Sequence, residues 1–437
     1  MTATGAVWRN WGRSQKVRPV RVERPSSVEA VQRAVEAARK QGLTLKAVGA
    51  GHSFTGIAVA PGVQLDLDDL SGIVSVDRQL GRVTLAAGTR LFTLERLLEP
   101  FGLAMENMGD IDRQSIAGAT STGTHGTGGR FGGLATQIVA MTLVTGNGEL
   151  LRVSETENAE LLPAARLGLG ALGILVDLTI QCVPAFLLHA LERPEPLGAV
   201  IDAYLQRSEE EDHFEFYWFP HTDTALTKTN TRLPADVQRH PLGRVGRFIE
   251  DELLANGLYR GVCRAGTIVP GIIPPFNRAA QRLTGNREFT DASPRVFVTN
   301  RTVRFREMEY ALPREAVPAA LAEVQSLIAS RGWRISFPVE VRSAAADENW
   351  LSTAYARDSG YIAVHRYLHE DPTEYFQAVE AIMVAHDGRP HWGKMHNRDA
   401  AALRRAYPRF DDFLAVRDNL DPDRVFENPY LRTVLGA

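Results

Sequence analysis

The stretch that most constrains the fold is residues 48–56, VGAGHSFTG, which places three glycines and one imidazole between two apolar segments. Glycines at this density let backbone amides approach an anion closely, and they adopt positive φ where a side chain would clash. A histidine followed by a hydroxyl indicates a reactive group beside a phosphate cradle. The motif alone leaves a tight turn between two strands open as the alternative.

The segments around this tract decide which nucleotide-binding fold is available. Ser26 and Glu29 form a capping box that predicts a helix, and residues 45–48 then predict a short strand. After the tract, apolar residues alternate with polar ones between Val63 and Leu85, which predicts further strands. A doubly wound dinucleotide fold needs a helix directly after the glycine turn, so that fold is excluded here.

A second tract rich in glycine, serine and threonine occupies residues 109–129 and leads into a predicted strand at 138–144. Its amides and hydroxyls predict a cradle for an extended polar ligand, with a flexible linker as the alternative. Residues 168–173, GLGALG, match the nicotinamide fingerprint by letter. They precede the predicted strand at 174–182 instead of following one, so we interpret them as close backbone approach to the same ligand.

Composition narrows the class of protein. The 437 residues are 44% hydrophobic and 23% charged, with a formal net charge of −3. These values predict a soluble globular chain of two domains and no nucleic-acid partner, and no apolar run reaches the ~18 residues of a membrane span. Two distant cysteines, Cys182 and Cys263, favour a reducing compartment, with the cytoplasm as the default expectation.

From about Pro184 the glycine tracts end and a second domain is predicted, with an irregular stretch at 230–290. Glu340 and Arg342 lie two apart on an otherwise apolar predicted strand, so both face one side. The pattern alone allows a catalytic pair or a structural ion pair. Lys394, in HWGK at 391–394, has the same ambiguity. The histidine pairs 365/369 and 391/396 have no third ligand at a suitable spacing, so no metal site is predicted.

Five features in this order resemble one family of flavoproteins. They are the first tract with His52, the second tract, the Glu340/Arg342 pair, HWGK, and the tail with Asp421, Pro422, Phe426, Asn428 and Tyr430. Together they resemble the aldonolactone oxidoreductases of the vanillyl-alcohol-oxidase type, of the L-gulono-1,4-lactone dehydrogenase and D-arabinono-1,4-lactone oxidase kind. The resemblance covers essentially the whole chain.

The resemblance implies an α+β fold with a two-subdomain FAD-binding domain at 1–183, an α+β cap domain at 184–412, and a C-terminal segment, 413–437, that returns to the FAD domain. It implies FAD attached covalently through His52, as an 8α-histidyl bond. The residues expected to bind the cofactor are Val48, Gly49, Ala50, Gly51, His52, Ser53, Gly56, Gly109, Asp110, Ser115, Gly118, Thr120, Ser121, Thr122, Gly123, His125, Gly126, Gly173, Ile174 and His391.

The resemblance also implies roles in catalysis. Arg342 and Lys394 are expected to stabilise the negative charge of reduced flavin, and Glu340 to bind the reacting hydroxyl and accept or relay its proton. Ser115, Glu340, Arg342, His365 and Lys394 are the expected substrate contacts, although a satisfied core histidine is an open alternative for His365. Gly109 is the expected oxygen gate, because glycine at this position leaves O₂ a path to the flavin.

The expected reaction is the FAD-dependent oxidation of an aldono-1,4-lactone at C2, by hydride transfer to flavin N5. The electron acceptor, O₂ or another redox partner, stays open. An alditol oxidase acting on xylitol- or sorbitol-type polyols at C1 is the alternative enzyme, since it shares the same charged residues. A non-catalytic flavin- or sugar-binding module is the alternative from another class. Peripheral membrane association is not indicated.

Overall fold

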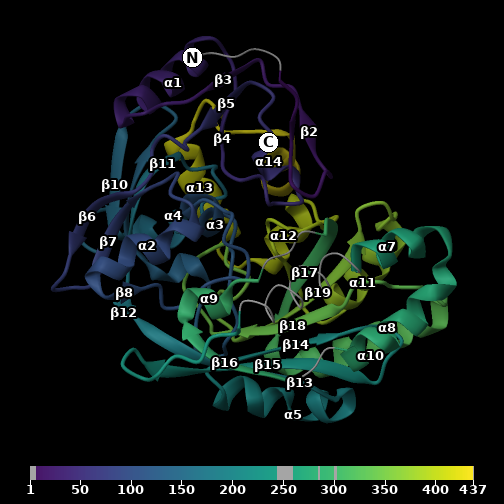
Figure 1. Ribbon diagram of the computed structural model, residues 1–437. Coiled ribbons are helices and arrows are strands. Elements are labelled where there is room, and N and C mark those ends of the chain that lie inside the picture. Colours follow the sequence, from purple (N-terminus) through teal and green to yellow (C-terminus); the bar gives the residue numbers. More distant parts are fainter. Residues whose placement is uncertain (1–5, 244–258, 284–285, 300–302, 437) are drawn as a thin grey trace.

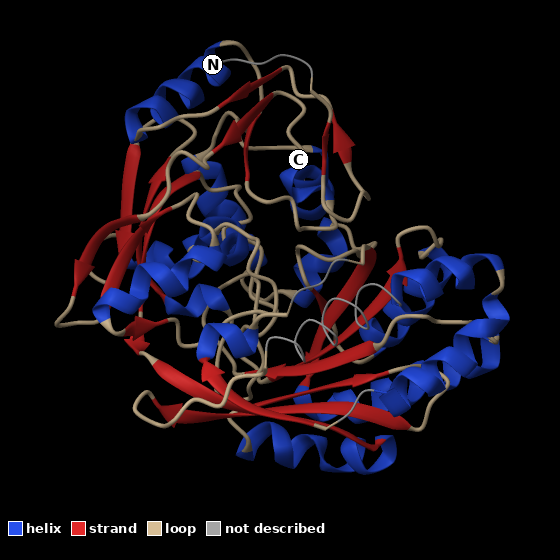
Figure 2. Cartoon of the chain, viewed as in Figure 1, coloured by secondary structure: helices blue, strands red, loops and turns tan. Residues whose placement is uncertain are grey.

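The computed structural model describes residues 6–243, 259–283, 286–299 and 303–436, and these form two parts that meet along a wide seam (Figures 1 and 2). The N-terminal part carries a three-stranded parallel sheet in the order β3-β5-β4 and a five-stranded antiparallel sheet in the order β10-β9-β11-β7-β6. The second part is built on one eight-stranded antiparallel sheet, in the order β16-β13-β15-β14-β18-β19-β17-β20. The two parts therefore differ in sheet architecture.

The N-terminal part packs short helices against its sheets. Helix α1 begins after Ser27, whose hydroxyl accepts a hydrogen bond from the amide of Ala30, so Ser27 is the N-cap and the prediction of Ser26 is wrong by one residue. The elements are β1 (Trp8–Arg9), β2 (Lys16–Val17), β3 (Arg21–Glu23), α1 (Val28–Lys40), β4 (Leu45–Val48), β5 (Val63–Asp66), β6 (Ile73–Asp77), β7 (Arg82–Ala86), α2 (Leu94–Leu98), β8 (Leu103–Ala104), α3 (Ile116–Ser121), β9 (Ile138–Val144), β10 (Leu150–Ser154), α4 (Leu162–Ala165), β11 (Ile174–Gln181) and β12 (Val183–Pro184).

The large sheet is covered on one face by helices α5, α10 and α11, visible below and to the right of the sheet in Figure 1. The apolar residues of its strands lie on this face and alternate with polar residues that lie on the other. Its elements are β13 (Phe186–Pro196), α5 (Leu197–Glu210), β14 (His213–Trp218), β15 (Thr224–Pro234), α7 (Tyr259–Ile268), α8 (Ile273–Leu283), β16 (Arg287–Ala292), α9 (Ser293–Phe297), β17 (Phe305–Pro313), α10 (Val317–Arg331), β18 (Val339–Ala344), β19 (Ser359–Tyr367), α11 (Thr373–Ala385) and β20 (Arg389–Pro390).

The stretch 230–290, predicted to be irregular, contains α7, α8 and most of β16, so that prediction is wrong where the structure describes it; residues 244–258 lie outside the described ranges. The helices here are amphipathic but short, and prolines at 270, 274 and 275 obscured their period in the sequence. None of the helices in the described ranges has both the length and the apolar character that a membrane crossing requires.

The chain ends with α12 (Ala400–Ala406), α13 (Phe410–Leu420) and α14 (Pro429–Leu435), drawn in yellow beside the N-terminal part in Figure 1. They share an apolar cluster with residues of that part such as Ile57 and Leu172. The Asn428 side chain donates hydrogen bonds to the carbonyls of Gly56, Ile57 and Val59 at 2.8–3.0 Å. The C-terminal segment therefore buttresses the loop that follows the first glycine tract.

Candidate active site

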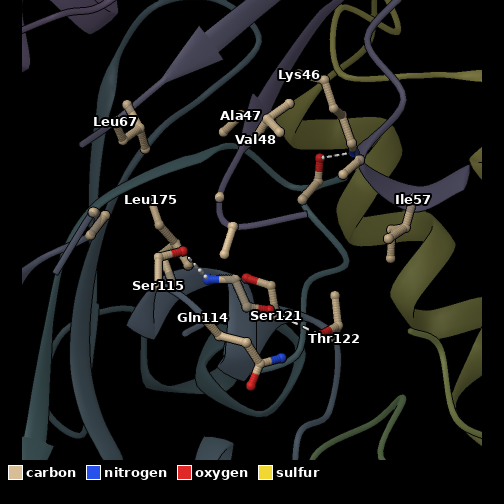
Figure 3. Close-up of a pocket in the computed structure, with 18 of the residues that line it drawn as sticks. Lys46, Ala47, Val48, Ile57, Leu67, Gln114, Ser115, Ser121, Thr122 and Leu175 are labelled. Carbon is tan, nitrogen blue, oxygen red and sulfur yellow. Dashed lines mark hydrogen bonds between the residues drawn. The ribbon is translucent and has the colours of Figure 1, made fainter. Parts of the chain in front are cut away.

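The two glycine tracts meet around a cavity of about 930 Å³, its solvent-filled mouth included, which we call the first cavity (Figure 3). In Figure 3, the strand residues Ala47 and Val48 lie across the hollow from Ser115, Ser121 and Thr122. The approach is close, because a Cβ added to Gly49 would lie 2.5 Å from the hydroxyl oxygen of Ser115. Glycine at position 49 is therefore required for the two tracts to come together.

Glycines and uncharged side chains make up most of the first cavity. Of the 25 residues that line it, only Lys46, His52 and Asp68 have ionisable side chains. The hydrogen bonds within the described ranges include none donated by the backbone amides of residues 49–53. A loop with several uncommitted amides, beside a cavity of this volume, fits the pyrophosphate of a dinucleotide such as FAD.

A second cavity of about 570 Å³ lies on the side of the large sheet and shares His52, Ser53, Gln114 and Thr122 with the first. Seven of its 16 lining residues are ionisable: His52, Asp110, His125, Glu309, Arg342, His391 and Lys394. His52 therefore lies at the junction between the first cavity, which has few ionisable residues, and the second cavity, which has many.

The His52 imidazole stacks on the indole of Trp11, with ring centroids 5.6 Å apart. Burial, together with the nearby positive charges of Lys394, Arg90 and Arg113, lowers the pKa of His52 to about 4. The ring is therefore neutral near pH 7, and a neutral imidazole has the lone pair that bond formation to an electrophile requires.

Arg342 is the centre of the charged region on the polar face of the large sheet. Its guanidinium forms ion pairs with Asp110 at 3.2 Å, with Glu215 at 3.1 Å and, most closely, with Glu340. Burial would lower the pKa of Arg342, but the three carboxylates outweigh it and raise the pKa well above its ordinary value. Asp110 comes from the second glycine tract, so this cluster joins the two parts of the molecule.

Lys394 is the second permanent cation of the cavity. Its ammonium lies 2.5 Å from Glu307 and 5.5 Å from the ring centroid of Phe54. Backbone hydrogen bonds from Phe54 to the carbonyl of Gly393 (2.6 Å) and from Met395 to that of Glu307 (2.8 Å) hold the HWGK loop between the first tract and β17. The lysine is therefore fixed at the seam.

Most of the residues expected to bind the cofactor or substrate line one or both cavities. In the first are Val48, Gly49, Ala50, Gly51, His52, Ser53, Ser115, Gly118, Ser121, Thr122, Gly173 and Ile174; in the second are His52, Ser53, Gly109, Asp110, Thr122, His125, Arg342, His391 and Lys394. Ser115 lines only the first cavity, where its hydroxyl caps α3 by accepting from the amide of Gly118. Its geometry therefore gives no direct support to a substrate contact.

Four expected cofactor residues line neither cavity, and each has a structural task. Gly56 presents its carbonyl to Asn428, and the Thr120 hydroxyl donates back to the carbonyls of Ile116 and Ala117. Gly123 has a φ of +80°, which favours glycine. A Cβ on Gly126 would come within 2.3 Å of the carbonyl oxygen of Met108.

Two expected catalytic or substrate residues also lie outside the lining of the second cavity. Glu340 is buried, paired with Arg342, and accepts a hydrogen bond from the Tyr217 hydroxyl at 3.1 Å. His365 is buried, with Nδ1 2.9 Å from the carbonyl of Pro338 and Nε2 3.6 Å from Glu307. Glu340 therefore supports Arg342, which lines the cavity, whereas neither Pro338 nor Glu307, the partners of His365, lines it.

The sequence reading missed Glu307 and Glu309 on β17, of which Glu309 lines the second cavity. The sequence did carry a signal for them, because charged and apolar residues alternate in the strand FREMEYALP, as they do in the strand that carries Glu340 and Arg342. Register places Tyr217, Glu340, Ala363 and Glu309 in one row across four strands. Small Ala363 separates the two glutamates, which lie two strand spacings, about 10 Å, apart.

One cluster has the spacing of metal ligands within the described ranges: ligand atoms of His125, Glu309 and His391 lie within 4.8 Å of one another. Spacing in the sequence pairs His391 with His396 and predicts no third ligand. Nδ1 of His391 accepts a hydrogen bond from the amide of Gly393 at 3.0 Å, which leaves only Nε2 for an ion. Lys394 competes for the same carboxylate charge.

Comparison with known proteins agrees with this architecture. Residues 19–154 match the FAD binding domain family, and residues 178–434 match the D-arabinono-1,4-lactone oxidase family. A solvent-stable cholesterol oxidase superimposes with a TM-score of 0.84 at 19% identity, covering 100% of this chain and 98% of the other, which shows a shared fold.

Curated relatives cover nearly the whole chain. An L-gulono-1,4-lactone dehydrogenase of Mycobacterium tuberculosis is 44% identical over 98% of this chain and 99% of its own. An L-gulonolactone oxidase of Bos taurus is 34% identical, covering 98% of each chain. An alditol oxidase of a Streptomyces species is 32% identical, covering 98% of this chain and 99% of its own.

The fold and the FAD-binding match define a flavoprotein of the vanillyl-alcohol-oxidase type, as the sequence predicted. Within that class, the chain belongs to the D-arabinono-1,4-lactone oxidase family.

Proposed function

We propose that the protein oxidises an aldono-1,4-lactone at C2, with FAD as the hydride acceptor. The observation that carries the proposal is the junction at His52 of a backbone-lined cavity of dinucleotide size and a smaller cavity with two fixed cations, Arg342 and Lys394. Relatives named for gulonolactone and arabinonolactone oxidation support this substrate class.

The chain's own residues have distinct tasks in this proposal. The first tract, the second tract and residues 173–174 would hold the FAD, which supplies the hydride acceptor when bound. Arg342 and Lys394 place positive charge beside the cavity before the reaction begins, so the negative charge that develops needs little reorganisation. Glu340 would bind the reacting hydroxyl and relay its proton, on the same sheet row as Tyr217.

We also propose that FAD is covalently tethered through His52. The position of His52 at the junction of the cavities, its stacking on Trp11 and its lowered pKa all support this role. A tether there would keep the cofactor in place while the lactone and the electron acceptor exchange in the second cavity.

Gly109 supports an oxygen-accessible site. It lines the second cavity, and a Cβ at this position would lie 3.2 Å from both the carbonyl oxygen of His125 and the Cγ2 of Thr124. A methyl group there would narrow the cavity wall, so glycine keeps open the approach that O₂ would take. The acceptor is proposed as O₂ or another redox partner.

The cap domain is proposed to run from 184 to 412, between an FAD domain at 1–183 and the returning segment 413–437. The abrupt change from the small sheets to the eight-stranded sheet supports the first boundary. The packing of α13 and α14 on the N-terminal part supports a returning C-terminal segment, and α12 shares this packing, so the return includes residues before 413. Two buried free cysteines, Cys182 and Cys263, support a reducing compartment such as the cytoplasm.

The proposed reaction is tested by mixing the purified holoenzyme with L-gulono-1,4-lactone without oxygen and following the flavin absorbance. We expect the visible flavin absorbance to bleach with saturation kinetics in lactone concentration. Retained yellow colour at saturating lactone contradicts the proposal.

An alditol oxidase is the second candidate, favoured by a relative that covers the chain nearly end to end. Xylitol and sorbitol are the discriminating substrates in the same anaerobic experiment. Faster bleaching by a polyol than by any of the lactones assigns the alditol reaction. No bleaching by either class indicates a binding module.

A further inference from the structure

The imidazole of His52 is held differently from the other histidine rings around the site. The rings of His125, His365 and His391 each have one nitrogen hydrogen-bonded to a backbone group, at 2.8–3.0 Å. No hydrogen bond between described residues involves the ring of His52. Its directional contact is the stack on the indole of Trp11, with ring centroids 5.6 Å apart and 22° between the planes.

This difference matters for a ring that is to form a covalent bond. The lone pair and the N–H of a neutral imidazole both point outward in the plane of the ring, so a hydrogen bond at a nitrogen occupies that nitrogen. A stacked partner lies against the face of the ring, where it restrains the tilt and leaves both nitrogens open. The stack on Trp11 therefore orients His52 without using a reactive position.

Trp11 is itself fixed by aromatic packing. Its indole meets the ring of Phe54 edge-on at 6.2 Å and that of Phe305 at 5.2 Å between centroids. Those two rings stack on each other at 5.8 Å, and Phe305 belongs to β17 of the large sheet. Trp11 thus joins the N-terminal part to the large sheet, and its face toward His52 has a fixed direction.

The backbone on both sides of His52 is held by the N-terminal turn, which we define as residues 10–15, between β1 and β2. The amide of Trp11 donates to the carbonyl of Gly51 at 2.7 Å. The side-chain amide of Asn10 donates to the carbonyl of Ser53 at 2.9 Å. The turn therefore fixes the residue before His52 and the residue after it.

The N-terminal turn packs closely on the first tract. A Cβ added to Gly12 would lie 2.6 Å from the ring of Phe54, and the hydroxyl of Ser14 donates to the carbonyl of Phe54 at 2.6 Å. Asn10 is only 2% exposed, and its side-chain oxygen accepts from the amide of Gln15 at 2.9 Å. Buried hydrogen bonds of this kind give the turn one position on the tract.

We propose that Trp11 is a positioning residue for the covalent attachment of FAD. Its indole holds the plane of the His52 ring at the junction of the two cavities, and the N-terminal turn holds the backbone that carries the ring. His52 lines both cavities, whereas Trp11 lines only the second, so the indole covers the ring from the side of the proposed lactone site. The inference rests on the proposed tether at His52 and names the residue that orients it.

Attachment joins an imidazole nitrogen to the 8α carbon of the flavin. One hydrogen leaves that methyl carbon and one leaves the imidazole, both as protons, and the remaining two electrons reduce the flavin. O₂ in the buffer takes up the two electrons and two protons as H₂O₂, which returns the flavin to its oxidised form. Burial, with the charges of Lys394, Arg90 and Arg113, lowers the pKa of His52 to about 4, so the ring has its lone pair available near pH 7.

The rate of attachment tests this role. Full-length protein is purified from riboflavin-limited cells, FAD is added in air, and the flavin that precipitates with the acid-denatured protein is followed with time. Trp11→Leu keeps an apolar side chain but removes the stacking face, and it should slow attachment by about 10- to 100-fold, as misorientation of a reacting group does. Trp11→Phe keeps a smaller face and should recover most of the rate.

Trp8→Leu is the matched control. Trp8 lies on β1 of the same hairpin, and its ring is 3.2 Å from where a Cβ on Gly51 would lie, but no ring stack between described residues joins it to His52. It should attach FAD at the wild-type rate. Attachment at the wild-type rate in Trp11→Leu, or equal slowing in Trp8→Leu and Trp11→Leu, overturns the proposal.

A measurement on the unmodified chain covers the case in which Trp11→Leu does not fold. In protein deuterated except at histidine and tryptophan, nuclear magnetic cross-relaxation reports ring protons that lie close together. We expect cross-peaks between the His52 ring, assigned by the loss of its signals in His52→Gln, and a tryptophan whose signals are absent in Trp11→Phe. A folded holoenzyme without these cross-peaks overturns the proposal.

The outcomes separate this inference from the tether itself. A wild type that acquires no acid-stable flavin shows that the tether is wrong, and the inference falls with it. Acid-stable flavin that forms equally fast in the wild type and in Trp11→Leu leaves the tether in place and shows that Trp11 does not position it.

Discussion

The two cavities of this protein share His52 but differ in the side chains that line them. The first is lined mainly by glycines, small side chains and backbone, with three ionisable residues among 25. The second is lined by seven ionisable residues among 16, most of them paired with a buried charge of the opposite sign. The first cavity therefore offers mainly uncharged groups to the cofactor that we propose it holds, whereas the second offers paired side-chain charges to the proposed substrate.

The lysines of the two cavities show the same contrast. Lys46 donates to the carbonyls of Leu169, Gly170 and Phe426 at 2.7–3.3 Å, and burial lowers its pKa to about 7. Burial also opposes the charge of Lys394, but Glu307 and Glu309 outweigh it and raise the pKa above its ordinary value. The two lysines differ in how close a carboxylate lies: Lys394 forms an ion pair with Glu307, whereas Asp421 only partly offsets the effect of burial on Lys46.

The largest effect is expected from Arg342→Met, compared with Ser121→Ala in the first cavity. The arginine substitution removes the fixed cation and should slow anaerobic flavin bleaching by about 10³-fold, as loss of a preorganised charge donor does. Ser121→Ala removes one uncharged hydroxyl from the first cavity and should leave the bleaching rate within about twofold. Stopped-flow absorbance measures both rates.

Arg342→Lys controls for folding, because it keeps the charge but loses the fork that pairs with three carboxylates. It should retain the flavin and recover part of the rate. If Arg342→Met and Ser121→Ala slowed anaerobic flavin bleaching equally, the proposed functional difference between the two cavities would be wrong.

The next largest effect is expected from Lys46→Met, which should change how the free energy of unfolding depends on pH. The folded pKa of about 7 lies below the ordinary value of 10.5, so between these values the unfolded chain binds a proton that the native chain does not. Stability from this group therefore rises with pH across that window. The free energy of unfolding, wild type minus Lys46→Met, should rise by about 1.4 kcal/mol per pH unit from pH 7.5 to 9.5.

Urea titrations at several pH values measure this difference. Lys394→Met gives the comparison, since the pKa of Lys394 is raised and the wild-type advantage should not grow over the same window. Parallel curves for wild type and Lys46→Met would show that Lys46 is charged in the native state, and the contrast between the lysines would fail.

The smallest effect is expected from Gly109→Ala. The added methyl must displace the carbonyl of His125 or the Thr124 side chain by a few tenths of an ångström, because both lie 3.2 Å from its position. We expect reoxidation of the reduced enzyme by air to slow about three- to tenfold while anaerobic bleaching by lactone changes little. An unchanged reoxidation rate would remove Gly109 as the oxygen gate.

Much of the fold was predictable because its signals are local. Alternation predicted the strands at 63–67, 138–144 and 174–182, and the absence of a helix after residue 56 correctly excluded the doubly wound fold. The family resemblance supplied the overall class. The helices α7 and α8 were missed because short, proline-rich segments carry little periodicity.

The sequence predicted part of each cavity: 12 of the 25 residues that line the first and 9 of the 16 that line the second. In the first cavity these residues belong mainly to the glycine tracts, which a sequence shows directly. Glu309 was missed because its importance comes from strand pairing: β17 and β18 are far apart in the chain and are joined only through β19. Spacing alone likewise cannot bring His125 next to Glu309.

We propose that one flavin crosses from the first cavity into the second at His52, and acid precipitation followed by peptide mapping tests this most directly. Trypsin should release residues 47–78, because Lys46 and Arg78 flank a stretch with no other lysine or arginine. We predict a yellow precipitate, and a peptide 47–78 that carries the mass of FAD on His52. A colourless precipitate, with all FAD in the supernatant and the peptide unmodified, contradicts the account.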